Sequence, residues 1–231
     1  MENLNIDTDL LLSKGFVKVP TLTLSDNERK DLLYNILNSK SNKIYLEMTD
    51  AHKQFLDMKN INKSLTPFLS NLAKKMGFLV NDKDIYCVTR VVNPNDPHES
   101  FKAHFDSHLF TLVTPIRIPR NENCDEGNGE LIAFPKLRSE PKLELFNIMQ
   151  KAFYKLFANE RGINYLSRNK DNYIFNFKDN NPVLFLGRTT LHFNLPVENK
   201  NGDKRVTLLT HFFDPSPKIG IGSILRKLRR R

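Results

Sequence analysis

The sequence predicts a mainly β fold with helical additions, in the form of an antiparallel barrel or two-sheet jelly roll. Seven short runs rich in β-branched and aromatic residues follow residue 80, and Asn, Asp, Gly and Pro separate them. The runs occupy 84–92, 108–118, 129–134, 172–177, 181–186, 189–197 and 205–213. So many short strands in succession favour a barrel or jelly roll over a doubly wound parallel sheet, whose strands alternate with helices.

Two helices are predicted within the first 80 residues. Ser25 and Glu28 have the spacing of a capping box, and an apolar periodic run follows them as far as Leu37. A second periodic segment covers 64–78. Residues 1–80 are therefore expected to be a mainly helical front piece, and 85–216 a jelly-roll core, within one domain spanning 1–216.

One further helix is predicted between the third and fourth strands. The segment 139–162 begins with Ser139 as a cap and Pro141, and its apolar residues then recur at helical spacing. Four aromatic residues are expected to form the packed face of this inserted helix: Phe146, Phe153, Tyr154 and Phe157.

Composition indicates a folded protein from a reducing compartment. The chain has 231 residues, of which 39% are apolar and 26% charged, which suits a single domain with a substantial core. Cys87 and Cys124 are far apart and have no metal-type spacing. The polar start lacks the features of a signal peptide, and no apolar run reaches the roughly 20 residues that span a bilayer. We therefore expect a cytoplasmic location.

The positive charge is concentrated at the C-terminus. The formal net charge is +9, and six cations follow Asp214 without an acid: Lys218, Arg226, Lys227, Arg229, Arg230 and Arg231. Residues 217–231 are predicted to be a basic amphipathic tail that lies on an anionic membrane surface, peripheral to the inner face. Nucleic acid is a weaker candidate because the tail has no aromatic residue to stack on bases, and a tail that only adds solubility is the third alternative.

Three potential metal ligands, His104, Asp106 and His108, stand at alternate positions. In an extended chain they would share one face, as an ordinary polar strand face or as part of a metal site. Two histidines and a carboxylate form the facial triad of non-haem Fe(II) sites, and His192 in a later apolar strand offers the remaining ligand. Zinc would accept the same three ligands.

Arg205 and Thr207 lie two apart on the last predicted strand and so share one of its faces. A buried arginine on a mostly apolar strand needs an anionic partner. A bound dicarboxylate would be such a partner, whereas a zinc hydrolase would leave Arg205 unexplained.

Four motifs in order, "HFD", "GNGELIAFP", "LHFNLPV" and "GDKRVT", resemble the Fe(II)- and 2-oxoglutarate-dependent dioxygenases, which have a double-stranded β-helix core. The resemblance covers about residues 85–215. It implies that His104, Asp106 and His192 ligate the iron and that Arg205, helped by Thr207, binds the distal carboxylate of 2-oxoglutarate. It further implies use of dioxygen, decarboxylation to succinate and hydroxylation of a substrate C–H bond. The ligand order of the family assigns His108 to the strand or pocket wall, and His211 is expected to be a packed or partly exposed histidine and not a ligand.

More loosely, the layout resembles the hydroxylases that act on the Kdo sugar of lipopolysaccharide. That resemblance implies a small-molecule or lipid-linked sugar substrate, with Arg90, Arg117 and Arg188 as candidate substrate residues. The alternatives are a protein or nucleic-acid oxygenase of the same chemistry, and a non-catalytic jelly-roll binding module.

Overall fold

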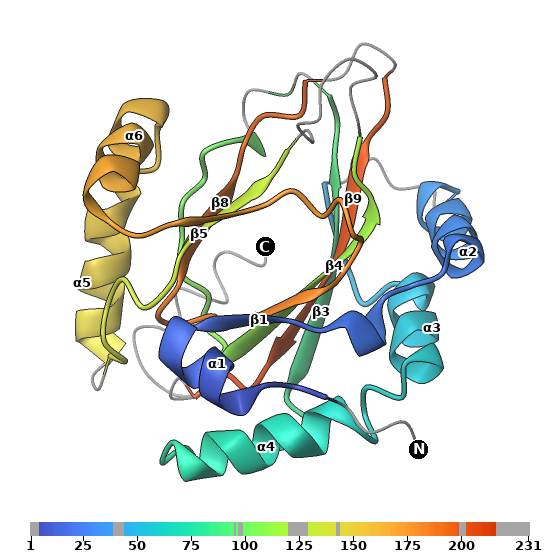
Figure 1. Ribbon diagram of the computed structural model, residues 1–231, viewed down its shortest axis with the longest axis horizontal. Helices are drawn as coiled ribbons and strands as arrows, with labels where there is room; N and C mark the ends of the chain where they lie inside the picture. Colours follow the sequence, from blue (N-terminus) through green and yellow to red (C-terminus); the bar gives the residue numbers. More distant parts are fainter. Residues whose placement is uncertain are drawn as a thin grey trace.

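The computed structural model contains two antiparallel sheets that face each other (Figure 1). It describes residues 5–38, 44–94, 96, 99–119, 129–141, 144–198 and 202–215. The predicted tail at 217–231, Cys124, and Gly127 and Asn128 of the glycine-rich motif lie outside these residues.

The large sheet has six strands in the order β1-β7-β4-β9-β3-β2. Its strands are β1 (Phe16–Lys18), β7 (Val183–Leu186), β4 (Phe110–Arg117), β9 (Arg205–Phe212), β3 (Ile85–Val92) and β2 (Tyr45–Glu47). The long strands β3, β4 and β9 lie side by side at its centre, and Arg205 on β9 pairs with Val92 on β3. This pairing directs alternate residues of β9 toward the small sheet.

The small sheet has three strands in the order β6-β5-β8. They are β6 (Tyr173–Phe175), β5 (Leu131–Phe134) and β8 (Leu191–Asn194). Apolar residues of both sheets, among them Val113, Leu131, Phe175 and Phe185, form a core between the two sheets. These packed side chains hold the two sheets together. A cavity occupies another part of the space between the sheets.

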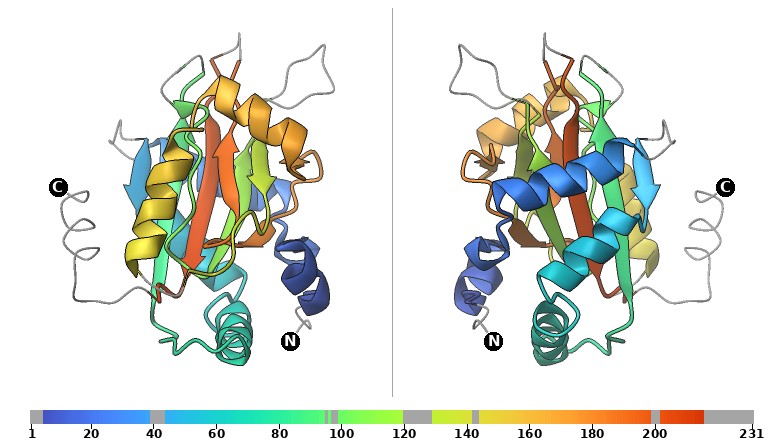
Figure 2. Two further views of the ribbon diagram at one scale, coloured as in Figure 1. Left: turned by 90° about the vertical axis from the view of Figure 1, so that its left-hand side faces the viewer. Right: turned by 90° about the vertical axis from the view of Figure 1, so that its right-hand side faces the viewer.

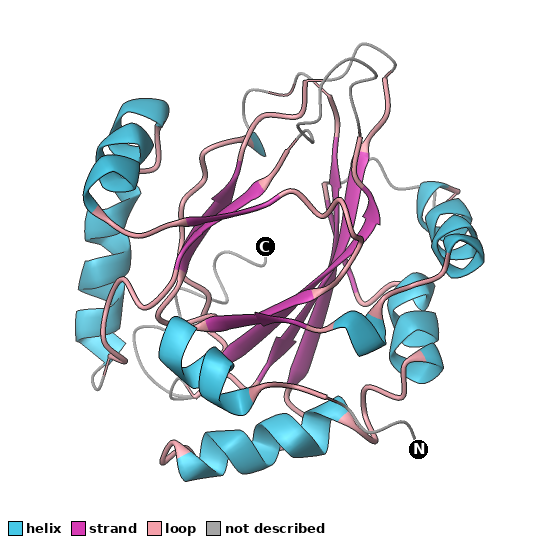
Figure 3. Cartoon of the chain, viewed as in Figure 1, coloured by secondary structure: helices cyan, strands magenta, loops and turns pink. Residues whose placement is uncertain are grey.

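Helices cover the outer face of each sheet (Figures 2 and 3). The helices are α1 (Thr8–Lys14), the 3-10 turn η1 (Pro20–Leu22), α2 (Asp26–Leu37), α3 (Asp50–Met58), α4 (Leu65–Lys75), α5 (Glu144–Lys155) and α6 (Glu160–Asn169). The N-terminal helices bury residues such as Leu32, Phe55 and Leu69 against the large sheet, whereas α6 packs Ile163 and Leu166 against the small sheet. Each sheet thus buries apolar residues on both of its faces, as a layered β fold requires.

The predicted strands and the two N-terminal helices are confirmed. Every one of the seven runs contains a strand, and the side chain of Ser25 caps α2 in a capping box with Glu28. The description of 1–80 as a helical front piece was incomplete, because β1 and β2 form the two edges of the large sheet. These strands are three residues long, too short to show a period of two in the sequence.

The predicted inserted helix is present as α5, and α6 follows it as a second, separate helix that was not predicted. The Asn159 side chain accepts a hydrogen bond from the Gly162 backbone N–H (2.9 Å) and so begins a new helix. The expected packed face is only half right. Tyr154 and Phe157 pack against the small-sheet cluster, whereas Phe146 and Phe153 are exposed.

Within the described residues, no helix combines the length and the apolar character needed to cross a membrane. Cys87 is buried on β3 as a free thiol.

A buried histidine on α3 predicts an acid-sensitive step in folding stability. His52 is fully buried, its Nδ1 lies 3.1 Å from the Thr89 hydroxyl, and burial lowers its pKa to about 4. The unfolded chain, with a pKa near 6.5, takes up the proton first. We expect the contribution of His52 to the free energy of unfolding to be fully present above pH 6.5. This contribution should fall by up to about 3 kcal/mol as the pH is lowered to 4.

Urea unfolding of the wild type and of His52→Gln across this pH range measures the effect. The difference between their unfolding free energies should shrink on acidification. A constant difference would contradict a neutral, buried His52.

Candidate active site

The segment 99–109 carries two of the predicted ligands from one sheet to the other. The backbones of His104 and His192 form an isolated antiparallel bridge to β8 in the small sheet, with both N···O distances 3.1 Å. Two residues later the Asp106 N–H donates to the Gly187 carbonyl (3.0 Å), next to β7 in the large sheet. The expected strand through His104 and Asp106 is therefore absent, because consecutive hydrogen bonds lead to different sheets.

The three predicted ligands nevertheless converge. Ligand atoms of His104, Asp106 and His192 all lie within 4.8 Å of one another, and no other cluster of this kind occurs among the described residues. The Nε2 atoms of His104 and His192 are 3.7 and 3.8 Å from Asp106 Oδ1. Two imidazole nitrogens and one carboxylate oxygen form the donor set that suits non-haem Fe(II) and leaves further coordination positions open.

Backbone carbonyls fix the tautomers of both histidines. His104 Nδ1 lies 2.7 Å from the Lys102 carbonyl, and His192 Nδ1 lies 3.2 Å from that of Thr190. A carbonyl can only accept, so each Nδ1 carries the proton and each Nε2 presents a lone pair toward Asp106. Metal-binding histidines in proteins commonly have this outer arrangement.

The electrostatics keep the carboxylate ionised and the buried imidazole neutral. Burial by itself would raise the pKa of Asp106, but His192, His211, His104 and the Thr111 hydroxyl hold that pKa well below its usual range. Burial lowers the pKa of His192. Both shifts favour the protonation states that bind a metal ion at neutral pH.

A second set of residues holds the Asp106 carboxylate in place. Thr111 on β4 donates to Asp106 Oδ2 (2.5 Å), and its oxygen also lies 3.0 Å from His211 Nδ1 on β9. Gly187 packs against the same group, because a Cβ at that position would be 3.0 Å from Asp106 Cβ and 2.7 Å from the His108 carbonyl. The absence of a side chain at Gly187 is therefore what allows Asp106 to approach the large sheet.

Removing the Thr111 hydroxyl should weaken metal binding without removing a ligand. We expect Thr111→Val to lower Fe(II) affinity by roughly 10- to 100-fold, the usual effect of losing an outer-shell hydrogen bond. Anaerobic titration with Fe(II) measures this change. Thr114→Val is the matched control, because Thr114 is equally buried on the same strand and its hydroxyl has no partner among the described residues. Equal affinities of the two variants would contradict the role given to Thr111.

A cavity of about 250 Å³ connects the ligands to Arg205. His104, Asp106 and His192 line it together with Arg205 and Thr207 on β9. Arg205 is 1% exposed, and its Nε and Nη1 have no hydrogen-bond partner within the described structure. Burial, and next the neighbouring Arg90, lower its pKa to about 9, which leaves the guanidinium charged at neutral pH. A buried charge with orphaned donors fits a carboxylate ligand.

Gly129 is the glycine that makes room for Arg205. It adopts φ +76°, and a Cβ there would lie only 2.7 Å from Arg205 Cδ and from Val197 Cγ2. The glycine of the "GNGELIAFP" motif is thus required by close packing over the arginine as well as by its backbone conformation.

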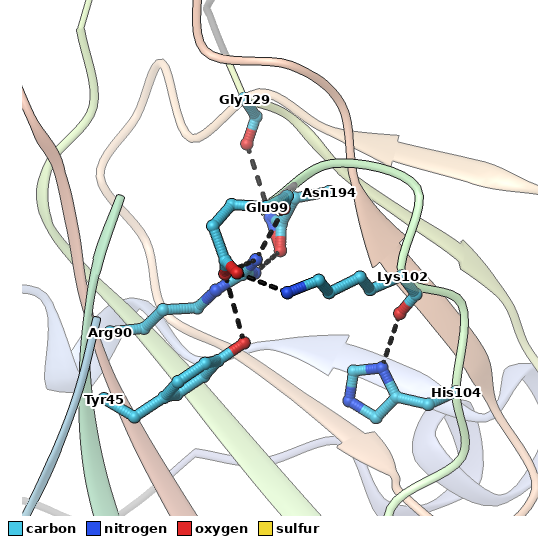
Figure 4. A network of polar contacts seen from close by, with 7 residues as sticks. All are labelled: Tyr45, Arg90, Glu99, Lys102, His104, Gly129 and Asn194. Carbon is cyan, nitrogen blue, oxygen red and sulfur yellow. Dashed lines mark hydrogen bonds and ion pairs between the residues drawn. The ribbon is translucent and has the colours of Figure 1, made fainter. Parts of the chain in front are cut away.

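Arg90 belongs to a buried polar network in the wall of this cavity (Figure 4). Its Nη2 donates to the Glu99 carbonyl (2.8 Å) and pairs with the Glu99 carboxylate (3.4 Å), while Nη1 donates to Asn194. Glu99 also accepts from Lys102, whose carbonyl holds His104. The network therefore ties the wall of the cavity to a metal ligand.

The other two arginine candidates lie differently. Arg117 donates to the Lys204 carbonyl (2.8 Å) and pairs with Asp203 (3.3 Å), and it does not line the cavity. Arg188 is buried, pairs with Glu140 and donates to the Ser107 carbonyl (3.3 Å). The structure places Arg90 at the cavity, Arg188 behind the Asp106 loop and Arg117 away from both.

His108 and His211 form an aromatic stack beside the ligands. Tyr86 stacks on both rings with centroids 5.9 Å away, and the two histidine rings are 5.1 Å apart. His108 is outside the ligand cluster, as expected, but it is not among the residues that line the cavity. His211 is packed as expected, and it also supports Asp106 through Thr111.

Comparison with known proteins identifies solved structures that have a similar fold. No protein-family model matches the chain, and no curated protein matches it in sequence. A prolyl-4-hydroxylase from Pseudomonas putida aligns over 90% of this chain and 92% of its own, with a TM-score of 0.55 and 14% identity. The non-heme alpha-ketoglutarate-dependent carbocyclase SnoK from nogalamycin biosynthesis aligns over 96% and 91%, with a TM-score of 0.55 and 13% identity.

The chain has the double-stranded β-helix fold of the 2-oxoglutarate-dependent oxygenases. A prolyl 4-hydroxylase from Phytophthora capsici gives the same result, with a TM-score of 0.54, 15% identity, and coverage of 96% of this chain and 71% of its own. The predicted fold class is therefore confirmed.

Sequence reasoning missed several residues that the fold brings to the site. Tyr45, Glu99, Thr111 and Gly187 stand in no motif with the ligands and approach them only through the pairing of strands and loops. An Asn two residues after His192 shares its strand face, and that spacing was the one available sign of Asn194.

Proposed function

We propose that this protein is an Fe(II)- and 2-oxoglutarate-dependent dioxygenase that hydroxylates a C–H bond. The observation that carries the proposal is the presence, in one buried cavity, of a His-Asp-His ligand cluster and of Arg205, whose Nε and Nη1 lack partners among the described residues. The cluster suits iron, and the guanidinium suits a carboxylate.

Each residue then has a defined task. His104, Asp106 and His192 hold Fe(II), and Arg205 with the nearby Thr207 hydroxyl binds the distal carboxylate of 2-oxoglutarate. Fe(II) with 2-oxoglutarate and dioxygen supplies an oxidant for C–H bonds, with release of succinate and carbon dioxide. Val88, Val113, Leu131 and Leu209 make part of the cavity wall apolar, which limits water around the reacting groups.

For the substrate we propose an anionic, membrane-associated sugar such as the Kdo of lipopolysaccharide. Cations near the Asp106 loop support an anionic substrate. Lys151 on α5 donates to the Ser107 hydroxyl (3.1 Å), and this is the one hydrogen bond of its amine among the described residues. The Lys151 amine has fewer protein partners than the guanidinium groups of Arg188 and Arg117, which protein acceptors hold.

The fold does not choose the substrate, since the neighbours named above include prolyl hydroxylases and a carbocyclase. The substrate class is tested by screening candidate substrates for stimulated release of succinate. A protein or nucleic-acid substrate would be identified by the same screen. Succinate release should rise with the true substrate and stay at the uncoupled rate with the others.

Anaerobic absorption spectroscopy tests the enzyme proposal before any substrate is known. Adding Fe(II) and then 2-oxoglutarate to the apo protein should produce a weak visible charge-transfer band. No band from the folded, iron-loaded protein would exclude 2-oxoglutarate chelation and favour a jelly-roll binding module. Failure to bind Fe(II) at all would exclude the iron site itself.

A further inference from the structure

Helix α5 is oriented with its apolar face outward. Its exposed side and the residue directly after it carry five large apolar residues, each more than half exposed, from 52% at Phe146 to 71% at Leu156. We call Leu145, Phe146, Met149, Phe153 and Leu156 the outer α5 stripe. At about 100° per residue these positions share one side of the helix, a stripe about 100° wide. A soluble surface helix normally turns such a stripe toward the core.

The opposite side of α5 attaches to the domain through polar contacts. Asn147 and Gln150 accept hydrogen bonds from Arg138 (2.9 and 3.2 Å), and Lys151 donates to Ser107. Tyr154 packs edge-on against Phe105 with centroids 5.2 Å apart. Because these contacts fix which side faces inward, the exposure of the stripe follows from how the helix is attached and not from local unfolding.

The stripe continues onto α6 and is bordered by cations. Phe153 contacts Phe157, whose ring contacts exposed Tyr165 of α6 (centroids 5.5 and 6.3 Å apart). Arg161 and Arg168, one turn to either side of Tyr165, share its exposed face. Large exposed apolar patches mark sites of interaction, and an apolar stripe with bordering cations matches the interfacial layer of an anionic bilayer.

The described part of the chain ends near this helix. Asp214, next to the last described residue, lies within electrostatic range of Lys151 on α5. Six cations follow it in the sequence. The point at which the basic segment joins the domain is therefore close to α5. Each cation near an anionic lipid surface contributes roughly 1 kcal/mol to the free energy of membrane binding at modest salt.

We infer that the outer α5 stripe docks the protein on an anionic lipid bilayer, with the stripe in the interfacial layer. The inner side of the same helix reaches Ser107, adjacent to the metal ligand Asp106. Docking through α5 thus brings the segment that carries Asp106 close to the lipid surface. The benefit for a lipid-linked substrate rests on the proposed function, whereas the docking itself requires neither iron nor 2-oxoglutarate.

A tryptophan reporter tests this directly, because the chain has no tryptophan of its own. We expect the emission of Phe153→Trp to shift to the blue, and to be quenched by brominated lipid, on adding phosphatidylcholine vesicles with about one third phosphatidylglycerol. Leu79→Trp is the matched control, since Leu79 is 98% exposed on another surface and should show no shift. An emission of the Phe153→Trp variant that vesicles leave unshifted would overturn the inference.

Vesicle sedimentation gives a second measurement on the full chain. The double variant Met149→Glu with Phe153→Glu should lower the vesicle partition constant at least about tenfold, while Leu79→Glu should not. An unchanged partition constant would place binding elsewhere.

Two further outcomes would also overturn the docking inference. If the Phe153→Trp variant emits in the blue without vesicles and its emission returns to the red on deleting 217–231, the tail covers the stripe. A shift that grows with protein concentration, with a dimer in sedimentation, would assign the stripe to a second copy. None of these measurements uses Fe(II) or 2-oxoglutarate, so their failure is distinct from failure of the proposed activity.

Discussion

Replacing Asp106 by alanine is expected to lower Fe(II) affinity by more than about 100-fold and to abolish the charge-transfer band with 2-oxoglutarate. Loss of an outer-shell hydrogen bond already costs roughly 10- to 100-fold, and Asp106 is a direct ligand candidate between His104 and His192. It is also the one acidic group in the described ligand cluster, so its loss leaves a 2+ ion with two neutral imidazoles. Anaerobic Fe(II) titration followed by absorption spectroscopy measures both effects.

Asp203→Ala is the control for this experiment. Asp203 is a carboxylate that pairs with Arg117 outside the cavity, and its removal should leave Fe(II) affinity unchanged. If Asp106→Ala kept wild-type affinity, the iron ligands would have to be sought among the neighbouring His108 and His211, and the proposed triad would be wrong.

Replacing Arg205 by methionine should strongly weaken 2-oxoglutarate binding while leaving Fe(II) binding intact. Truncating one partner of a buried charge pair costs about 2–5 kcal/mol. This corresponds to roughly a 30- to 5,000-fold loss of 2-oxoglutarate affinity. The expected result is a protein that takes up Fe(II) normally but develops the charge-transfer band only at far higher 2-oxoglutarate concentrations.

Stability separates this binding role from a structural one. Methionine is apolar and similar in length, and two guanidinium nitrogens of Arg205 lack partners among the described residues. The free energy of unfolding of apo Arg205→Met should therefore not fall below that of the wild type. A large loss of stability would instead assign Arg205 to the core. Arg117→Met, which removes a guanidinium outside the cavity, should change neither property.

Local sequence patterns and the order of the motifs were enough to predict many of the secondary-structure elements and the residues that meet at the candidate site. Ser25 and Glu28 predicted the cap of α2 because capping is decided by residues three apart. Runs of β-branched and aromatic residues predicted the strands. The motifs "HFD", "LHFNLPV" and "GDKRVT" predicted three ligand candidates and an arginine, and these four residues line one cavity. His104 and Asp106 converge as expected although they do not lie on a strand, because residues two apart in an extended segment can still reach the same point.

Contacts between distant segments were decided only by the tertiary structure. Thr111 and Gly187 support Asp106 because β4 and the turn after β7 meet there, and no spacing in the sequence links them. The three-residue strands β1 and β2 form because the edges of the large sheet offer them hydrogen-bond partners.

Helix α5 shows most clearly what each level determines. The amino-acid sequence by itself determined that this segment is an amphipathic helix, because periodicity is a local property. It did not determine which side faces the domain. The hydrogen bonds of Arg138 and Ser107 to the polar side turn the outer α5 stripe to the solvent, against the usual preference for burying apolar residues. Orientation is set by partners far away in the chain, and these partners meet the helix only in the folded protein.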